Sequence, residues 1–253
     1  MKKEQLNFLV QVVFVLITLV IIAVLLIKRF VYFHPSRHFL PTMETYKPVQ
    51  VGHINGAMLE YKGKTDRVIL YCHGNAGNIS HCESEMVALR NLGYDVVCFD
   101  YSGFGRSGGI PSEQQLYDDA SLMVSFLRQY YDHDKIIPYG FSMGGAVASY
   151  VALRFNLPIL ILQCPIPSIR HVAQVKMPWT KWVSFLFPEF DTEKYLQSYK
   201  GRSLLIYSVH DQQIPPNSLK HLLDYCTKTI RTTGSHMNTK VPWNEVQQFI
   251  QQS

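Results

Sequence analysis

The sequence lacks any run of lysine or arginine, although its 24 basic side chains outnumber its 19 acidic ones. Nucleic-acid surfaces are built from clustered basic residues, so these scattered charges argue against nucleic acid as a partner. Internal repeats and low-complexity tracts are also missing, which argues against a repeat architecture. What remains is 253 residues with 47% hydrophobic content, enough for one large domain with its own core.

The sequence has few cysteines, and their number is odd. The chain has five, Cys72, Cys82, Cys98, Cys164 and Cys226, and three of these lie in apolar segments typical of buried strands or strand ends. A disulfide framework needs paired cysteines in a small, loop-rich chain. We therefore expect free thiols in the core.

One long apolar run is present near the N-terminus. Segment 8–27 is polar only at Gln11 and Thr18, and as a helix it is long enough to cross a hydrocarbon core of roughly 30 Å. A cleaved signal peptide would have a shorter apolar region and a small-residue cleavage site, whereas this run ends in basic residues. We predict a retained transmembrane signal anchor at 8–27, with a short tail at 1–7, a connector at 28–48 and the lipid bilayer as partner.

The orientation of this anchor is not fixed by charge, because basic residues flank the run on both sides. A single glycosylation sequon begins at Asn78, beside the region that we assign to the active site below. A glycan there would obstruct substrate, which favours a cytosolic catalytic domain. The side of the membrane stays open.

After the connector, short apolar runs alternate with segments of helical spacing over residues 49–253, the pattern of an α/β sheet. The predicted buried strands are 67–72, 95–99, 135–139, 158–163, 203–209 and 228–232. Two earlier stretches, 49–51 and 57–61, are predicted as antiparallel edge strands. Predicted helices start near Asn78, after a capping box at Ser112, at Met143 and at Trp243.

The segment 164–200 departs from this alternation. It combines several prolines with Trp179, Trp182, Phe185, Phe187 and Phe190. We predict an insertion over the sheet, whose aromatic residues either pack against the core or form an apolar lid for an acyl chain.

A candidate nucleophile lies in the stretch Gly140-Phe141-Ser142-Met143-Gly144. This stretch follows a predicted strand and opens directly into a helix, which is the setting of a nucleophile elbow. The small flanking residues permit the sharp turn that lifts a serine hydroxyl above the sheet. We predict Ser142 as the nucleophile of an α/β-hydrolase fold, a mostly parallel sheet with helices on both faces.

A second match to the same spacing occurs at Gly105-Arg106-Ser107-Gly108-Gly109. It leads to Ile110-Pro111, so no helix begins at this serine and the elbow setting is missing. We predict a structural role for Ser107.

A serine hydroxyl is a poor nucleophile unless an imidazole accepts its proton. In this fold the order is serine, acid, histidine. Of ten histidines, only His236 follows the last predicted strand, and we predict it as the general base. Asp211 follows the strand at 203–209, where catalytic groups gather, and we predict it as the residue that orients His236. Asp191 and Asp224 lie in the insertion and in a helix.

Acyl transfer places negative charge on a carbonyl oxygen, which backbone N–H groups must stabilise. The N–H of Met143, at the start of its helix, is one candidate. The loop His73-Gly74-Asn75 leaves the strand at 67–72 in the position of an oxyanion loop, and the N–H of Asn75 is the second. We expect His73 itself to be structural.

Five motifs in order, HGNAGNIS, YSGFGRSGGIPSE, GFSMGGAVA, SVHDQQIPP and GSHMN, resemble the membrane-associated alpha/beta hydrolase domain-containing proteins, most closely the branch of abhydrolase domain-containing protein thirteen. The resemblance implies a serine hydrolase with one N-terminal type II span and a triad at Ser142, Asp211 and His236. A related branch resembles protein depalmitoylases. Phe141, Ser102 and Met237 depart from the family pattern, which puts any transfer of substrate preference in doubt.

The sequence thus predicts a membrane-anchored serine hydrolase that cleaves an ester or thioester of an acyl lipid or acylated protein through an acyl-enzyme, with no metal or organic cofactor. A peptidase or a small-ester esterase is the alternative within the same class. An inactive membrane-tethered binding module, or a structural membrane protein, is the alternative outside it.

Overall fold

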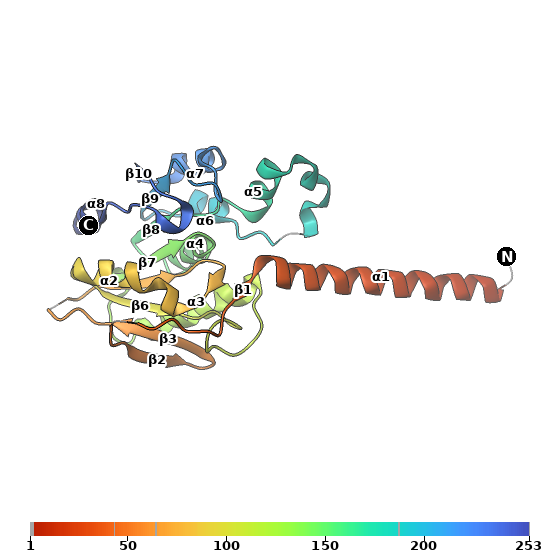
Figure 1. The fold of residues 1–253 in the computed structure, drawn as a ribbon, viewed down its shortest axis with the longest axis horizontal. Helices are drawn as coiled ribbons and strands as arrows, with labels where there is room; N and C mark the ends of the chain where they lie inside the picture. Colours follow the sequence, from red (N-terminus) through yellow and green to blue (C-terminus); the bar gives the residue numbers. More distant parts are fainter. Residues whose placement is uncertain (1–2, 43, 64, 187, 253) are drawn as a thin grey trace.

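The computed structural model describes residues 3–42, 44–63, 65–186 and 188–252. Eight strands form the central sheet: β2 (Lys47–Val51), β3 (Ile54–Leu59), β4 (Val68–Cys72), β6 (Asp95–Phe99), β7 (Ile136–Phe141), β8 (Ile159–Gln163), β9 (Arg202–Ser208) and β10 (Lys228–Thr232). Their spatial order is β10-β9-β8-β7-β4-β6-β3-β2 (Figure 1). All neighbours from β6 to β10 are parallel, whereas β2 and β3 run antiparallel.

The predicted strands are confirmed to within a residue or two at most ends, with one error of placement. The stretch predicted as a second edge strand, 57–61, belongs to β3, which lies between β2 and β6 rather than at the edge. The tight connection at Gly52, whose φ is +58°, folds β2 back onto β3. Only β2 is therefore left at this edge.

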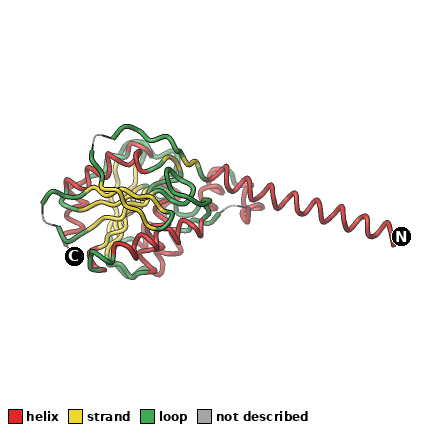
Figure 2. Tube along the Cα trace, turned by 90° about the horizontal axis from the view of Figure 1, so that it is seen from below, coloured by secondary structure: helices red, strands yellow, loops and turns green. Residues whose placement is uncertain are grey.

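Alternate residues of each buried strand face two separate cores, because strand side chains point to opposite faces in turn. Val68, Leu70 and Cys72 of β4 belong to one core, and Ile69 and Tyr71 belong to the other. The first core is covered by α3 (Glu113–Leu127), α4 (Gly144–Arg154), α6 (Thr192–Ser198) and α7 (Lys220–Tyr225). The second is covered by α2 (Glu83–Asn91) and α8 (Trp243–Gln251). The sheet is thus sandwiched between helices (Figure 2).

The starts of two helices follow the predicted capping residues. The Ser112 side chain accepts the N–H of Gln115 at the start of α3, but the Gln115 amide donates to Asp119, so the predicted capping box is only half formed. Asn78 caps a 3₁₀ turn, η1 (Ile79–Cys82), that leads into α2.

The side-chain amide of Asn78 is buried and already engaged. It donates to the backbone carbonyls of Ser36 and His38 at 3.0 and 2.8 Å. In the folded chain this sequon nitrogen is therefore not exposed to a glycosylating enzyme. All five cysteines are free thiols, and four of them are buried, as predicted.

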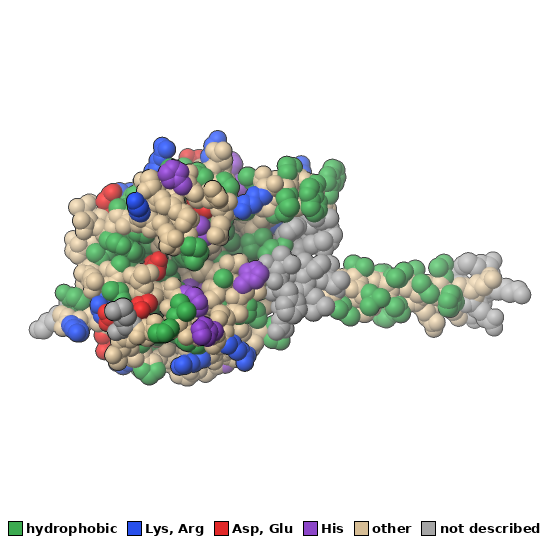
Figure 3. Space-filling model, viewed as in Figure 1, with side chains coloured by type: hydrophobic (Ala, Val, Ile, Leu, Met, Phe, Trp, Pro, Cys, Tyr) green, Lys and Arg blue, Asp and Glu red, His purple; other side chains and the backbone are tan. Residues whose placement is uncertain are grey.

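A helix of 30 residues, α1 (Lys3–Tyr32), projects away from the body (Figure 1). Apolar side chains cover much of its described surface (Figure 3), with Phe14 69% and Val20 62% exposed. Within the described residues, no helix combines the length and apolarity that a membrane crossing requires. The predicted anchor at 8–27 is therefore not confirmed, and the side chains of 23–27 lie outside the described set.

The chain leaving α1 docks directly on the body. Phe33 is buried, and its ring meets those of Phe104 and Phe190 edge-on, with centroids 6.3 and 5.9 Å away. The next two residues form β1 (His34–Pro35), which pairs in parallel with β5 (Ala76–Gly77). The connector therefore lies against the loop that follows β4.

The insertion contains α5 (Ile169–Lys176), η3 (Pro178–Leu186) and α6. Its aromatic residues divide: Phe190 packs in the core, whereas Trp179 and Trp182 are 64% and 84% exposed. Phe187 lies outside the described residues, as does the side chain of Phe185. Core packing, one of the two predicted alternatives, thus holds for Phe190 and not for the two tryptophans.

Candidate active site

Ser142 occupies the sharp turn between β7 and α4. Its φ is +55°, a left-handed value that a residue with a side chain adopts at an energetic cost. The turn closes only because its neighbours are small. A Cβ on Gly144 would overlap the carbonyl oxygen of Cys72, and a Cβ on Gly140 would overlap that of Gly144. The strained backbone and the two glycines together lift the serine hydroxyl above the sheet.

The structure brings Ser142, His236 and Asp211 into one hydrogen-bonded chain. The Nε2 atom of His236 lies 2.9 Å from the Oγ of Ser142, and its Nδ1 lies 2.6 Å from the Oδ2 of Asp211. All three residues are buried. His236 opens a short 3₁₀ turn, η5 (His236–Asn238), after β10, and Asp211 follows β9. Residues far apart in sequence thus meet at the carboxyl edge of the sheet.

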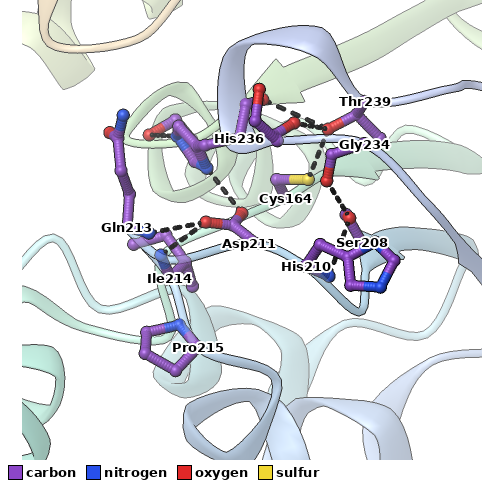
Figure 4. Close-up of polar contacts among 12 residues, drawn as sticks. Cys164, Ser208, His210, Asp211, Gln213, Ile214, Pro215, Gly234, His236 and Thr239 are labelled. Carbon is purple, nitrogen blue, oxygen red and sulfur yellow. Dashed lines mark hydrogen bonds and ion pairs between the residues drawn. The ribbon is translucent and has the colours of Figure 1, made fainter.

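The second oxygen of the Asp211 carboxylate is also satisfied. Oδ1 accepts the backbone N–H groups of Gln213 and Ile214, each at 2.8 Å (Figure 4). Burial by itself raises the pKa of Asp211, but the hydrogen bond with His236 and these two N–H groups outweigh it, so the pKa lies below its usual value. The carboxylate is thus held ionised and oriented toward the imidazole.

Ser208, at the end of β9, contributes to this arrangement and was not predicted. Its hydroxyl donates to the carbonyl of Gly234 and accepts the N–H of His210 at 3.1 Å (Figure 4). This ties the loop that carries His236 to the strand that carries Asp211. No sequence signal marks it beyond its place at a strand end.

Cys164 is a second residue that lies beside Asp211 and His236 and was not predicted as part of the site. It follows β8 with φ +44°, and its Sγ lies 3.1 Å from the hydroxyl of Thr239. Burial raises the pKa of this thiol to about 11, so it stays protonated at neutral pH.

Cys164, Asp211 and His236 each offer one possible ligand atom for a metal ion, all within 4.8 Å of one another (Figure 4). A metal would have to replace the proton shared by His236 and Asp211, whose atoms are already 2.6 Å apart. The thiol would also have to lose its proton, against its raised pKa. The donor set therefore fits a proton-handling site better than a metal site.

The loop after β4 passes close to the nucleophile. A Cβ placed on Gly74 would lie 3.6 Å from the Cβ of Ser142, so the next residue, Asn75, borders the same space. Within the described residues, the N–H groups of Asn75 and Met143 donate no hydrogen bond. Both groups remain available for an oxyanion, as their proposed role requires.

His73 contacts the backbone of this loop through its ring. Its Nδ1 lies 2.8 Å from the carbonyl oxygen of Gly74, and its own carbonyl accepts the hydroxyl of Tyr101 at 2.9 Å. Burial lowers the pKa of His73, which favours the neutral ring. The Nδ1 atom must then carry the proton to donate to Gly74. The ring of His73 thus contacts the backbone of this loop, in agreement with the structural role expected from the sequence.

Ser107 lies away from this chain. Its hydroxyl donates to the carbonyl of Asp100 at 2.6 Å and accepts the N–H of Asn55 at 2.8 Å. The side chain is buried and fully used in joining two backbone segments. This geometry agrees with the predicted structural role.

A cavity of about 320 Å³ opens beside Ser142 and His236. It is lined by the loop at 73–76 and by residues of η1, α2 and η5, together with Tyr71, Phe141 and Gln213. Glu85, an acidic residue of α2, is among the residues that line it. Among the described residues, none of the insertion at 164–200 lines this cavity, so the predicted lid over an acyl chain is not seen.

Comparison with known proteins relates this chain to a described family. A family model described as Serine aminopeptidase, S33 matches residues 63–229, a range that includes Ser142 and Asp211 and ends before His236. The alpha/beta hydrolase domain-containing protein WAV2 of Arabidopsis thaliana is 30% identical, with 76% of this chain and 71% of the relative covered. An uncharacterized membrane protein of Saccharomyces cerevisiae, YNL320W, is 28% identical over 76% of this chain and 73% of its own.

Among solved structures, the esterase Pf2001 of Pyrococcus furiosus superposes with a TM-score of 0.71 at 18% identity, covering 87% of this chain and 98% of the esterase. At this identity the likeness establishes the α/β-hydrolase fold and not the substrate. Together with the matched family model, it assigns the chain to a class: this protein is a hydrolase of the α/β-hydrolase fold and belongs to the Serine aminopeptidase, S33 family.

Proposed function

We propose that this protein is a serine hydrolase that cleaves an ester or thioester through Ser142, His236 and Asp211. The observation that carries the proposal is the continuous chain from the Ser142 hydroxyl through both ring nitrogens of His236 to Asp211, with spacings of 2.9 and 2.6 Å, beside an open cavity. Proton transfer requires this spacing, and the buried setting strengthens it.

In the proposed reaction, the Oγ of Ser142 attacks the carbonyl carbon while Nε2 of His236 takes the hydroxyl proton. Asp211 accepts the Nδ1–H and stabilises the imidazolium. The N–H groups of Met143 and Asn75 stabilise the oxyanion. As the tetrahedral intermediate collapses, the bond from the acyl carbon to the leaving oxygen or sulfur breaks, this atom takes the proton from Nε2, and an alcohol or thiol departs from the acyl-Ser142. Water then attacks, His236 accepts its proton and returns it to Ser142, and the carboxylic acid leaves.

A fluorophosphonate probe tests this proposal because it reacts only with an activated serine. We expect the wild type to be labelled and Ser142→Ala to lose the label. Ser107→Ala is the matched control, since it removes a buried hydroxyl from the other Gly-x-Ser-x-Gly loop and should keep the label. A folded wild type that takes no label, or a label that persists in Ser142→Ala, would refute the assignment.

For the substrate, we propose an acyl lipid or an acylated protein. The cavity volume lies at the small end of the range for ligand pockets, about 300–1,000 Å³, so part of a long acyl chain would lie outside it. A series of p-nitrophenyl esters and acyl thioesters of increasing chain length tests this. Higher kcat/KM for long chains supports the proposal, and a sharp optimum at acetate supports a small-ester esterase instead.

Membrane attachment through α1 is part of the same proposal, as a single type II span of the kind found in the membrane-associated hydrolases that the sequence resembles. Three observations support it. Apolar side chains on α1 are exposed, the hydroxyl of Thr18 is satisfied by the carbonyl of Phe14 at 2.9 Å, and one relative is described as a membrane protein. Alkaline carbonate extraction of cell membranes tests it: a spanning protein stays in the pellet, and release into the supernatant counts against the span.

A peptidase is the second candidate, because the matched family is described as a serine aminopeptidase and the acidic residue Glu85 lines the cavity. Such a carboxylate could bind a substrate's ammonium group. An aminoacyl-arylamide assay of Glu85→Gln separates the two functions. A peptidase should lose affinity for the arylamide in this variant, whereas an acyl esterase should show no arylamide turnover in either form.

A further inference from the structure

The backbone around Asn75 is held on two sides, by His73 and by the connector that leaves α1. The N–H of His34 donates to the carbonyl of Asn75 at 2.9 Å, and the side-chain amide of Asn75 donates to the carbonyl of Tyr32 at 3.2 Å. Two residues on, the N–H of Ser36 donates to the carbonyl of Gly77 at 3.0 Å. The chain between α1 and the sheet is thus bonded along the loop that borders Ser142.

These bonds fix the direction of one N–H group. In a trans peptide the C=O and the N–H point in opposite directions. His73 holds the peptide between residues 74 and 75 through the Gly74 carbonyl, and His34 holds the next peptide through the Asn75 carbonyl. The Asn75 N–H lies in the first of these planes, and the Asn75 carbonyl lies in the second. Because both planes are held, the φ and ψ angles of Asn75 are set, and the second bond keeps the chain after Asn75 from turning the first plane and its N–H away.

The connector is itself rigidly attached to the body. Phe33 is 6% exposed and packs against Phe104 and Phe190. Beyond β1, the Asn78 amide holds the carbonyls of Ser36 and His38. The only strand partner of β5 in the described structure is β1. The loop therefore depends on the connector for its extended conformation.

We propose that residues 32–36, which join α1 to the hydrolase domain, are positioning residues for catalysis: through His34 they hold the Asn75 N–H in line with the oxyanion. This inference rests on the proposed serine hydrolase function. On this proposal α1 also affects catalysis. A shift of its C-terminal end would move the oxyanion loop through the hydrogen bonds that Tyr32 and His34 make with Asn75 and through the buried ring of Phe33.

The test is a pair of variants of the full chain that differ in one backbone N–H. Proline has no N–H, so His34→Pro removes the bond to Asn75, whereas His34→Ala keeps it and removes only an exposed side chain. Loss of a whole oxyanion donor costs roughly 10²–10³-fold in kcat. A donor left in place but poorly aimed should cost less, and we expect kcat for a p-nitrophenyl ester to fall about 10-fold to 100-fold in His34→Pro.

KM should change little in His34→Pro, because the donor acts on the transition state more than on the bound ester. His34→Ala should retain wild-type kcat. Hydrogen exchange of the peptide covering residues 73–78 should be faster in His34→Pro alone. As a second route to the same loop, Asn75→Ala removes the bond to Tyr32 while keeping the N–H, and we expect a smaller fall in kcat.

Two failures can be told apart. If the wild type takes no fluorophosphonate label, the proposed function is wrong. If the wild type is labelled and the His34→Pro and His34→Ala proteins, both folded by circular dichroism, have equal kcat, the hydrolase stands and the positioning role of the connector is wrong.

Discussion

Two loops of this chain share the spacing Gly-x-Ser-x-Gly, and their serines meet very different surroundings. The hydroxyl of Ser142 faces the imidazole of His236 at 2.9 Å, from a backbone with φ +55°. The hydroxyl of Ser107 joins the carbonyl of Asp100 to the N–H of Asn55. Both serines are buried, at 8% and 4% exposure, so burial does not separate them.

What separates them is the element that follows. Behind Ser142 a helix begins at once, so the chain must turn sharply and the side chain projects above the sheet. Ser107 continues into a loop, and α3 begins only at Glu113. A serine whose hydrogen bonds all go to the backbone has no group to take its proton. The local setting, and not the motif, therefore predicts the chemistry.

The largest effect on kcat should come from removing the imidazole of His236, because Ser142 would then lack a proton acceptor, as Ser107 does. In His236→Ala we expect kcat for an ester substrate to fall by roughly 10⁶, the scale seen when a triad histidine is removed. Burst and steady-state kinetics with a p-nitrophenyl ester measure this. His210→Ala is the control, since it removes a histidine from the adjacent loop that makes no side-chain hydrogen bond to the triad in the described structure. If kcat of His236→Ala were less than about 10²-fold lower than that of the wild type, another base would have to accept the proton of Ser142.

Asp211→Asn should cause the next largest loss of kcat. The isosteric amide keeps the packing but no longer fixes the imidazole tautomer, and we expect kcat to fall by about 10⁴ with little change in the circular dichroism spectrum. An unchanged kcat would show that His236 does not depend on Asp211.

The same variant carries a stability signature. The pKa of Asp211 is lowered in the folded chain, so ionised Asp211 stabilises the fold above its unfolded pKa of about 3.9, and this contribution is lost as pH falls through the lower folded value. Asn cannot titrate. Urea denaturation should therefore show the stability difference between wild type and Asp211→Asn shrinking as the pH falls below about 4. A difference that grows on acidification would contradict the lowered pKa.

Much of the fold could be predicted from the sequence because its strands are buried on both faces and appear as continuous apolar runs, such as residues 68–72. The place of β3 could not. The first half of β3 contains Asn55 and Gly56, residues that are uncommon in strands, and the pairing with β6 is what places the strand inside the sheet. The aromatic residues of the insertion pose the same difficulty, since composition does not tell which face Phe190 or Trp182 occupies.

For the site, the helix that directly follows Ser142 and the chain order of Asp211 and His236 were enough to select the three residues, which the structure brings together. Order works here because parallel strands deliver their carboxyl ends to one edge of the sheet. The β1–β5 pairing gives no such signal, since it is made of backbone bonds between two very short segments. Cys164 and Ser208 likewise depend on the side chains that tertiary folding places beside them.

A smaller effect is expected at His73, whose ring bonds to the carbonyl of Gly74 in the loop that borders Ser142. His73→Ala removes the ring that holds the Gly74 carbonyl, so the Asn75 N–H is less well aimed. We expect a loss of about 10²-fold in kcat, at the low end of the cost of an oxyanion donor. Buried ring packing against Tyr101 is lost as well. His73→Gln is therefore the informative partner, since its amide can still donate to Gly74. Recovery of kcat in the glutamine variant supports a positioning role, and equal losses in both variants would point to packing alone.

The smallest effect on activity is expected at Ser107, where the comparison predicts a change of a different kind. Ser107→Ala leaves the N–H of Asn55 and the carbonyl of Asp100 without their shared partner. An orphaned buried group costs about 1–3 kcal/mol, so the free energy of unfolding should fall by that amount in urea denaturation. Fluorophosphonate labelling per folded molecule should stay at the wild-type level. If Ser107→Ala instead lost the label while keeping its stability, Ser107 would be chemically active, and the difference drawn between the two loops would be wrong.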